Sequence, residues 1–230
     1  MSNDVQLLIE NWGTPHCSAS KNSDINTNIR IDESSNGVKG TYISGIFMQA
    51  EKVNGNGRIY PKAVLEHAVN EYINTQVDTN QALGELNHPS RSTPDPREAA
   101  IIIEELWFEG NNVMGRARVL DTPNGKIVKS LIEGGWIPGV SSRGLGRVKT
   151  VNGINEVQEG FKLTVGVDVV HQPSAPDAYV QGYTVDKNGT VDTMVSPSNM
   201  KTENTNSIKE NLNTKNIDVV SFTEKMKSLI

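Results

Sequence analysis

A chain of 230 residues is long enough to bury a substantial core, as one large domain or as one domain with tails. Its net charge of −5 and the absence of a lysine- or arginine-rich run argue against a general nucleic-acid binder. The one cysteine, Cys17, excludes an internal disulfide and a cysteine-based zinc cluster. No apolar stretch reaches membrane-spanning length, so we expect a soluble intracellular protein.

The N-terminal part, residues 1–40, is mostly polar apart from a strand-like segment, Leu7–Gly13. Residues 41–53 are rich in β-branched and aromatic side chains and predict a strand that ends at the turn signal "NGNGR". Residues 60–77 predict a helix, because Pro61 suits its first turn and apolar residues recur on one face.

Residues 98–120 favour a β-hairpin about the turn Gly110-Asn111-Asn112, although 99–106 taken alone also fits a helix. A second helix is predicted from the N-cap Thr122 to Gly134. Strands return between 136 and 170, with a turn at Asn152-Gly153. Several strands with two interspersed helices predict an α+β fold, in a barrel or a strongly curved sheet.

The C-terminal part changes in character, which sets the limits of the structured domain at 41–182. Residues 183–215 are almost all polar or small and predict a flexible linker. Residues 216–230 place apolar side chains on one helical face and predict a short amphipathic helix.

His88 is the first candidate catalytic residue, in the motif "GELNHP". Pro89 restricts His88 to extended geometry, so its imidazole is expected at the end of a strand. A loop histidine without a role is the alternative reading of the residue types alone. His16 and His67 carry weaker signals, and His171, also at a strand end, stays open.

Ser141 and Ser142 lie in "GVSSRG", among glycines that would let a substrate backbone approach closely. Adjacent strand residues face opposite sides, so one of the two at a time can point into a site. A bulge with solvated serines is the alternative. A serine nucleophile also needs a base and a residue that orients that base.

Asp168 is an acidic residue in the otherwise apolar strand "TVGVDVV". A buried carboxylate is costly without a partner, so Asp168 either faces outward or is held by a donor such as an imidazole. Weaker acidic candidates are Glu85, Asp177 and the adjacent pair Glu104 and Glu105, whose side chains should diverge on a strand. The sequence contains no metal-ligand spacing and no phosphate loop.

Taken together, "GELNHP", "GWIPGVSSRGLG" and "EGFKLTVGVDVV" resemble the prohead core proteases of T4-like tailed phages, over about residues 7–180. The resemblance implies a serine endopeptidase with a herpesvirus-protease-like fold, a closed or strongly curved antiparallel β-barrel with flanking helices. It makes His88 the base and Ser141 the nucleophile, with Ser142 as the alternative. Asp168 takes the third position, where the herpesvirus enzymes carry histidine.

The same resemblance suggests Arg143 or Arg147 as the residue that polarises the oxyanion, and it implies no cofactor and no metal. It implies cleavage after glutamate in the pattern Leu or Ile, any residue, Glu. We expect self-cleavage after Glu210, inside the predicted linker, with Glu10 as a second candidate. Glu133 completes a third match but lies in a predicted helix, which should protect it.

The substrates implied are the scaffold or core proteins and the major capsid protein, within the prohead in the host cytoplasm. A homo-oligomer, such as a ring, is the implied assembly, with no nucleic acid or membrane as partner. The alternative function is a non-catalytic ring- or tube-forming capsid assembly protein on the same barrel. The presence of His88, Ser141 and Asp168 in one chain favours the protease.

Overall fold

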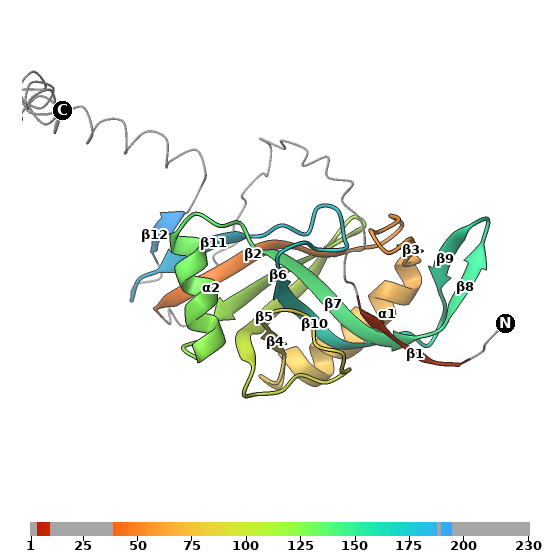
Figure 1. Ribbon diagram of the computed structural model, residues 1–230, viewed down its shortest axis with the longest axis horizontal. Coiled ribbons are helices and arrows are strands. Elements are labelled where there is room, and N and C mark those ends of the chain that lie inside the picture. The colour runs from red at the N-terminus through yellow and green to blue at the C-terminus, as the bar shows by residue number, and fades with distance from the viewer. Residues whose placement is uncertain (1–3, 10–38, 188–189, 195–230) are drawn as a thin grey trace, which may run out of the picture. The chain divides into compact units, whose positions relative to one another are not determined.

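The computed structural model describes residues 4–9, 39–187 and 190–194 (Figure 1). Within these residues the strands form three open sheets, and two α-helices pack against them. Glu10, Glu210, His16 and the predicted C-terminal helix lie outside the described residues.

The largest sheet is antiparallel and has the strand order β12-β11-β2-β6-β5-β4. Its strands are β2 (Gly40–Gln49), β4 (Leu83–Glu85), β5 (Ala99–Glu109), β6 (Asn112–Val119), β11 (Gln181–Val185) and β12 (Val191–Met194). The strands β5 and β6 form the predicted hairpin, so the helical alternative for residues 99–106 was wrong. Regular alternation of buried and partly buried residues along β6 gives this sheet one face toward the core.

The second sheet carries the candidate catalytic residues and has the order β1-β7-β10. Its strands are β1 (Gln6–Ile9), β7 (Gly139–Gly146) and β10 (Lys162–Val170), each antiparallel to its neighbour. Every residue of β10 from Val165 to Val170 is buried. A strand covered on both faces has no solvent to hydrate its polar groups, so any charge on it needs a protein partner.

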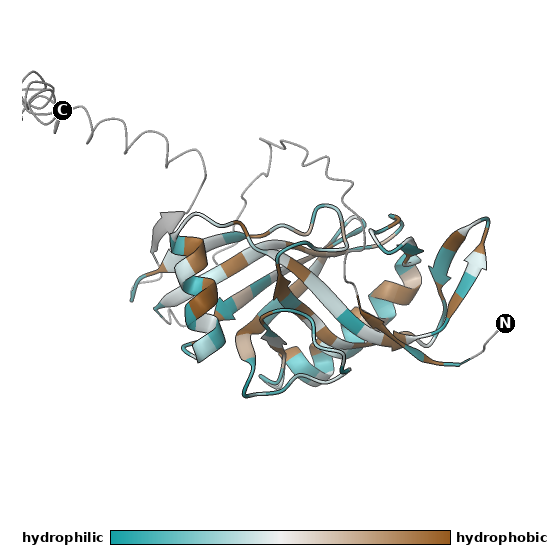
Figure 2. Cartoon of the chain, in the orientation of Figure 1, coloured by the Kyte–Doolittle hydropathy of each residue, from teal (hydrophilic) through white to brown (hydrophobic). Residues whose placement is uncertain are grey.

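The third sheet joins β3 (Arg58–Ile59) to the hairpin of β8 (Val148–Val151) and β9 (Ile154–Val157), with β3 parallel to β9. The hairpin projects at one end, and each of its two strands has apolar residues at its ends and two polar residues between them (Figure 2). Its turn residues Asn152 and Gly153 have φ of 51° and 81°, as the predicted Asn-Gly turn requires.

Both predicted helices are present. Helix α1 (Lys62–Tyr72) continues into a π-helical turn, Ile73–Val77, and packs its buried face against β10. Helix α2 (Pro123–Glu133) packs against β5 and β6, and the Thr122 hydroxyl accepts a hydrogen bond of 3.1 Å from the Gly125 amide. The N-cap prediction at Thr122 is thereby confirmed.

Two expectations need correction. The α+β class holds, but the strand pairing of the described residues leaves the sheets open, so the closed barrel is not confirmed. The first two sheets meet at isolated bridges, Leu86 with Val169 and Gly139 with Tyr179, instead of a continuous ladder. The predicted linker began too early, because β11 and β12 extend the large sheet to Met194. Short strands rich in threonine and glycine gave too weak a hydrophobic signal there.

Strand β4 packs so closely against β10 that one added methyl group at Gly84 should destabilise the fold. A Cβ added at Gly84 would lie 2.2 Å from the Val167 carbonyl oxygen and 2.8 Å from Ile101 Cγ1. Gly84→Ala is expected to lower the free energy of unfolding by about 3 kcal/mol. Gly40→Ala is the control, because its nearest contact would be an ordinary 3.5 Å, and it should shift stability by less than about 0.5 kcal/mol. Urea denaturation of both variants checks this; equal midpoints would contradict it.

Candidate active site

His88 is brought to Asp168 by the chain that leaves β4. Leu86 bridges to Val169 in β10, and the Asn87 amide donates a 2.8 Å hydrogen bond to the Val169 carbonyl. Asn87 has φ of 69°, a left-handed conformation that asparagine tolerates better than most residues. The resulting bend places the His88 imidazole against Asp168, with Nδ1 2.7 Å from Oδ2.

The His88–Asp168 contact fixes the tautomer of the imidazole. A carboxylate accepts hydrogen bonds, so the Nδ1 nitrogen carries the proton and the neutral ring keeps its lone pair at Nε2. Both side chains are fully buried. Within the described part of the chain, His88 Nε2 is buried and has no hydrogen-bond partner. A buried polar atom of this kind is costly, and such atoms are frequent where a group is kept ready for catalysis.

Asp168 is held by more than His88. The Glu85 amide donates to its Oδ1 at 2.8 Å, and the Arg143 guanidinium donates to the same oxygen at 2.9 Å. The Arg143 Nε lies 2.6 Å from Oδ2, a close ion-pair contact without the alignment of a hydrogen bond. Three groups, the His88 imidazole, the Glu85 amide and the Arg143 guanidinium, thus make four contacts with one carboxylate.

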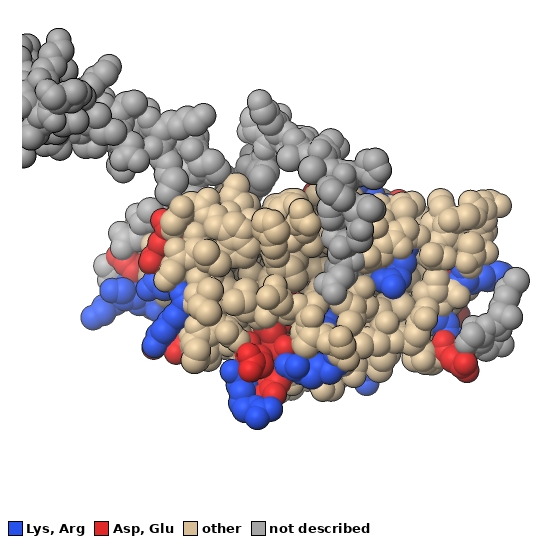
Figure 3. Space-filling model, in the orientation of Figure 1, with Lys and Arg blue, Asp and Glu red and all other residues tan. Residues whose placement is uncertain are grey.

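Arg143 also connects the site to the segment after β4. Its Nη1 donates to the Arg91 carbonyl at 2.8 Å, and its Nη2 lies 3.6 Å from Glu85 Oε2. The buried Glu85 carboxylate accepts two hydrogen bonds of 2.7 Å from Arg91 and a further one from the Asp95 amide. Acidic and basic side chains gather over this segment, at the lower edge of the view (Figure 3). The buried Glu85 carboxylate is therefore paired with Arg91 and Arg143. These contacts hold the segment after β4 against the His88–Asp168 pair.

Ser141 is the register partner of Asp168 across β7 and β10. Residues directly opposite one another in an antiparallel pair project their side chains to the same face, and Arg143, two residues along β7, shares that face. Ser142 alternates to the other side of the strand. Both serines are buried, at 3% and 8% exposure.

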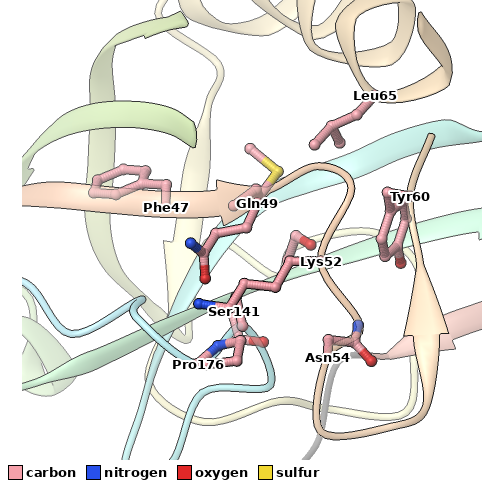
Figure 4. Close-up of a pocket in the computed structure, with 11 residues that line it drawn as sticks. Phe47, Gln49, Lys52, Asn54, Tyr60, Leu65, Ser141 and Pro176 are labelled. Carbon is pink, nitrogen blue, oxygen red and sulfur yellow. The ribbon is translucent and has the colours of Figure 1, made fainter. Parts of the chain in front are cut away.

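A small cavity lies beside the two serines (Figure 4). It measures about 20 Å³, room for a single water molecule. Its walls come from β2, the loop after β2, α1, β7 and the segment between β10 and β11, and comprise Phe47, Met48, Gln49, Lys52, Asn54, Tyr60, Leu65, Ser141, Ser142, Ala175 and Pro176.

His88 lines a different cavity from the serines. That second cleft is open, about 440 Å³, and is formed by the residues after β4 together with Arg91 and Asp95. Because His88 Nε2 has no partner among the described residues, no hydrogen bond joins it to Ser141 or Ser142. The structure therefore pairs His88 with Asp168 and places Ser141 opposite Asp168 in the strand register.

The remaining candidates lie elsewhere. The Arg143 guanidinium is engaged with Asp168 and Arg91, away from the serine cavity. Arg147 is exposed beyond the end of β7, six residues from Ser141, or about 20 Å at a strand's rise. The Arg143 guanidinium is thus already bound to other groups, and the oxyanion role of either arginine stays a prediction. His67 and His171 are exposed.

The acidic pair Glu104 and Glu105 is used in ion pairs on the large sheet. Glu104 Oε1 accepts from Arg118 at 2.8 Å and Glu105 Oε1 from Arg116 at 2.6 Å. Arg116 also lies over the Tyr42 ring, 5.4 Å from its centroid. The expected divergence of the two side chains was wrong, because a register shift between Ile103 and Glu105 interrupts the alternation and both carboxylates pair with Arg116.

Tyr72 of α1 lies close to the site and remains neutral. Burial raises the pKa of the Tyr72 phenol to about 12, with the Asp168 carboxylate adding to the shift and Arg143 opposing it. The π-helical turn follows directly after this residue. The charged cluster around Asp168 is thus bounded on the α1 side by an uncharged aromatic ring.

No group of three or more His, Cys, Asp or Glu residues in the described ranges is arranged to hold a metal ion. Among the same residues, no helix is long and apolar enough to cross a membrane.

Two parts of the site were missed by sequence reasoning. One is the ion pair between Arg143 and Asp168, and the other is the ion pair between Arg91 and Glu85. Strand alternation puts Arg143 on the face of Ser141, which could have suggested a partner for a buried aspartate. The Glu85–Arg91 contact depends on a loop bend that no pattern predicts.

Removing the Arg143 charge tests this network. Arg143→Met is expected to lower the free energy of unfolding by about 3–5 kcal/mol, because Asp168 and Glu85 would remain as buried carboxylates without their shared cation. Arg97→Met is the control, since that side chain is 86% exposed and pairs with Asp95 at the surface, and it should cost less than about 1 kcal/mol. Guanidinium denaturation measures both. Similar losses in the two variants would contradict the buried-network account.

Comparisons with known proteins show the family of this chain. Residues 7–190 match the family model described as prohead core protein serine protease. The chain is 55% identical to the prohead core protein protease of enterobacteria phage T4, over 186 residues that cover 77% of this chain and 84% of that protein. The solved structure of the bacteriophage T4 capsid assembly protease, gp21, is similar at a TM-score of 0.61 and 50% identity, covering 74% of this chain and 100% of that one. The chain therefore belongs to the family of prohead core protein serine proteases.

Proposed function

We propose that the chain is a serine endopeptidase of phage prohead maturation in which Ser141, His88 and Asp168 form the catalytic triad. The observation that carries this proposal is the 2.7 Å contact between His88 Nδ1 and Asp168, which is itself held by further contacts from Glu85 and Arg143. Nε2 of the same ring is buried and has no partner among the residues that the structure describes. A base oriented in this way is what a serine hydroxyl needs to become a nucleophile.

The proposed chemistry follows from these positions. His88 Nε2 takes the proton of the Ser141 hydroxyl as Ser141 Oγ attacks the scissile carbonyl, and the imidazolium then protonates the leaving amine. Asp168 stabilises the imidazolium, and Arg143 positions Asp168. Water, activated by His88, hydrolyses the acyl-enzyme and regenerates Ser141. The oxyanion is assigned to backbone amides of the glycine-flanked end of β7, since the Arg143 guanidinium is engaged with Asp168 and Arg91 and Arg147 is exposed beyond the end of the strand.

The pairing across β7 and β10 favours Ser141 over Ser142. Asp168 lies opposite Ser141, whereas Ser142 falls at a register shift of the β10 strand. The proposal requires a movement of β7 against the segment after β4 that brings Ser141 within reach of His88. Such catalytic hydrogen bonds are often long in free enzymes and shorten when the substrate binds. We infer that assembly or substrate supplies this movement.

The substrates proposed are the prohead core or scaffold proteins and the major capsid protein, cut after glutamate in Leu- or Ile-x-Glu sites inside the prohead. Self-cleavage after Glu210 and Glu10 is proposed on the same pattern. Glu133 completes the pattern too but ends helix α2, where the chain is not extended. The experiment is co-expression of the full chain with a core protein that carries one such site, followed by intact-mass spectrometry. Fragments ending in glutamate support the proposal, and an uncut core protein would contradict it.

A further inference from the structure

Lys52 is a cation at the edge of the serine cavity. The large sheet's strand β2 ends at Gln49, and Glu51 then adopts φ of 57°, which turns the chain so that Lys52 reaches back to the cavity. Figure 4 shows Gln49 and Lys52 extending toward the part of the cavity that holds Ser141 and Pro176. A lysine beside a catalytic serine is suited to bind a carboxylate.

The protein's own Asp177 occupies these groups. Its Oδ2 accepts from Lys52 Nζ at 2.6 Å and from Gln49 Nε2 at 3.0 Å, and its amide donates to Gln49 Oε1 at 3.2 Å. The Lys52 hydrogen bond, ahead of the Gln49 bond, lowers the pKa of Asp177 from its usual value, although partial burial opposes the shift. The carboxylate therefore remains ionised at neutral pH.

Asp177 belongs to a strap, residues 172–178, that crosses the cavity. Ser174 fastens the strap to the loop after β2, because its carbonyl accepts from the Gly55 amide and its hydroxyl from Asn56 Nδ2, each at 2.9 Å. Ala175 and Pro176 then form one wall of the cavity. With the strap in place, a volume of about 20 Å³ is too small for a glutamate side chain.

The ion pair between Lys52 and Asp177 is weak enough for another carboxylate to replace Asp177. Its side chains are 45% and 38% exposed, so water competes for both charges and the pair adds little to stability. The end of the strap at Ala178 is held to the β-sheet, because the Ala178 carbonyl accepts a 2.9 Å hydrogen bond from the Val140 amide. An incoming carboxylate can thus replace Asp177 without unfolding the sheet.

We infer that Lys52 and Gln49 form the subsite that binds the acidic side chain of the substrate next to the scissile bond, and that Asp177 fills this subsite in the free protein. The inference deepens the proposed function and rests on it. Lys52 then determines specificity for an acidic peptide, and Asp177 delays the binding of substrate until the strap moves.

The test uses the full chain, co-expressed with two matched core proteins that carry either Leu-x-Glu or Leu-x-Gln at one site. Intact-mass spectrometry over time gives the rate ratio for the two sites. In Lys52→Gln the ratio is expected to fall about 30-fold, the loss of one charge-assisted hydrogen bond. Lys126→Gln is the control, because Lys126 pairs with Asp121 on the exposed side of α2, and it should keep the wild-type ratio.

Asp177→Asn tests the second half of the inference. It keeps the size of the side chain but removes the charge held by Lys52. The state in which Lys52 and Gln49 are free to bind substrate should then be more populated, so cleavage at the glutamate site should become about threefold faster or more. A slower rate would show that Asp177 supports the subsite instead of filling it. If Lys52→Gln keeps the wild-type preference for glutamate, the subsite is wrong while the protease stands. If the wild type cuts neither core protein, the proposed function itself fails.

Discussion

Ser141→Ala is expected to lower kcat/KM for cleavage at a Leu-x-Glu site by about 10⁴-fold or more, because it removes the only atom proposed to form the acyl-enzyme. The substitution deletes one buried hydroxyl and should leave the fold intact. The measurement is the rate of core-protein cleavage by intact-mass spectrometry, with the thermal unfolding midpoint recorded for each variant.

Ser142→Ala is the matched control for Ser141→Ala. It removes the same group one residue along β7, from a side chain that is also buried, on the opposite face of the strand. Its activity should remain within about tenfold of wild type, the loss expected from a small packing defect near the site. The reverse order, with Ser142→Ala inactive and Ser141→Ala active, would move the nucleophile to Ser142.

Asp168→Asn is expected to lower kcat by about 10⁴-fold, because an amide at this position favours the wrong tautomer of His88. It also leaves the buried Arg143 without its closest anion, so the free energy of unfolding should fall by about 3–5 kcal/mol. Activity is therefore to be compared at a temperature where circular dichroism shows the variant folded.

Glu85→Gln separates the two effects of Asp168→Asn. Glu85 is a buried carboxylate of the same network and also pairs with Arg143, but it does not contact His88. Glu85→Gln should thus lose comparable stability and only about tenfold in kcat. If both variants lose activity equally when folded, Asp168 acts in the structure alone and the triad account is wrong.

Much of this site could be predicted from the sequence, for physical reasons that differ between residues. Pro89 restricts His88 to an extended conformation, and an aspartate in the apolar strand around Asp168 demands a partner, so their meeting was a sound hypothesis. The turn at Asn152 and the cap at Thr122 were equally well defined, because each residue type has one favourable local conformation there.

The rest depends on long-range packing that local patterns do not encode. Arg143 was expected to face an oxyanion, but burial on the face of Asp168 makes a carboxylate the cheaper partner for its charge. Asp177 looked like a rival catalytic acid and instead binds Lys52, which lies more than a hundred residues earlier in the chain. The closed barrel was expected from the family resemblance, whereas closure depends on pairing between strands far apart in the sequence, and the described strands form separate sheets.

The most direct test of the central claim is to identify the nucleophile chemically while the enzyme works. A fluorophosphonate probe, which forms a covalent bond with serines activated by a base, would be added to wild-type protein during core-protein cleavage, and the adduct would be located by peptide mass spectrometry. The triad account predicts one adduct, on Ser141, that stops cleavage and disappears in Asp168→Asn. An adduct on Ser142, or cleavage that continues at full rate with Ser141 modified, would contradict it.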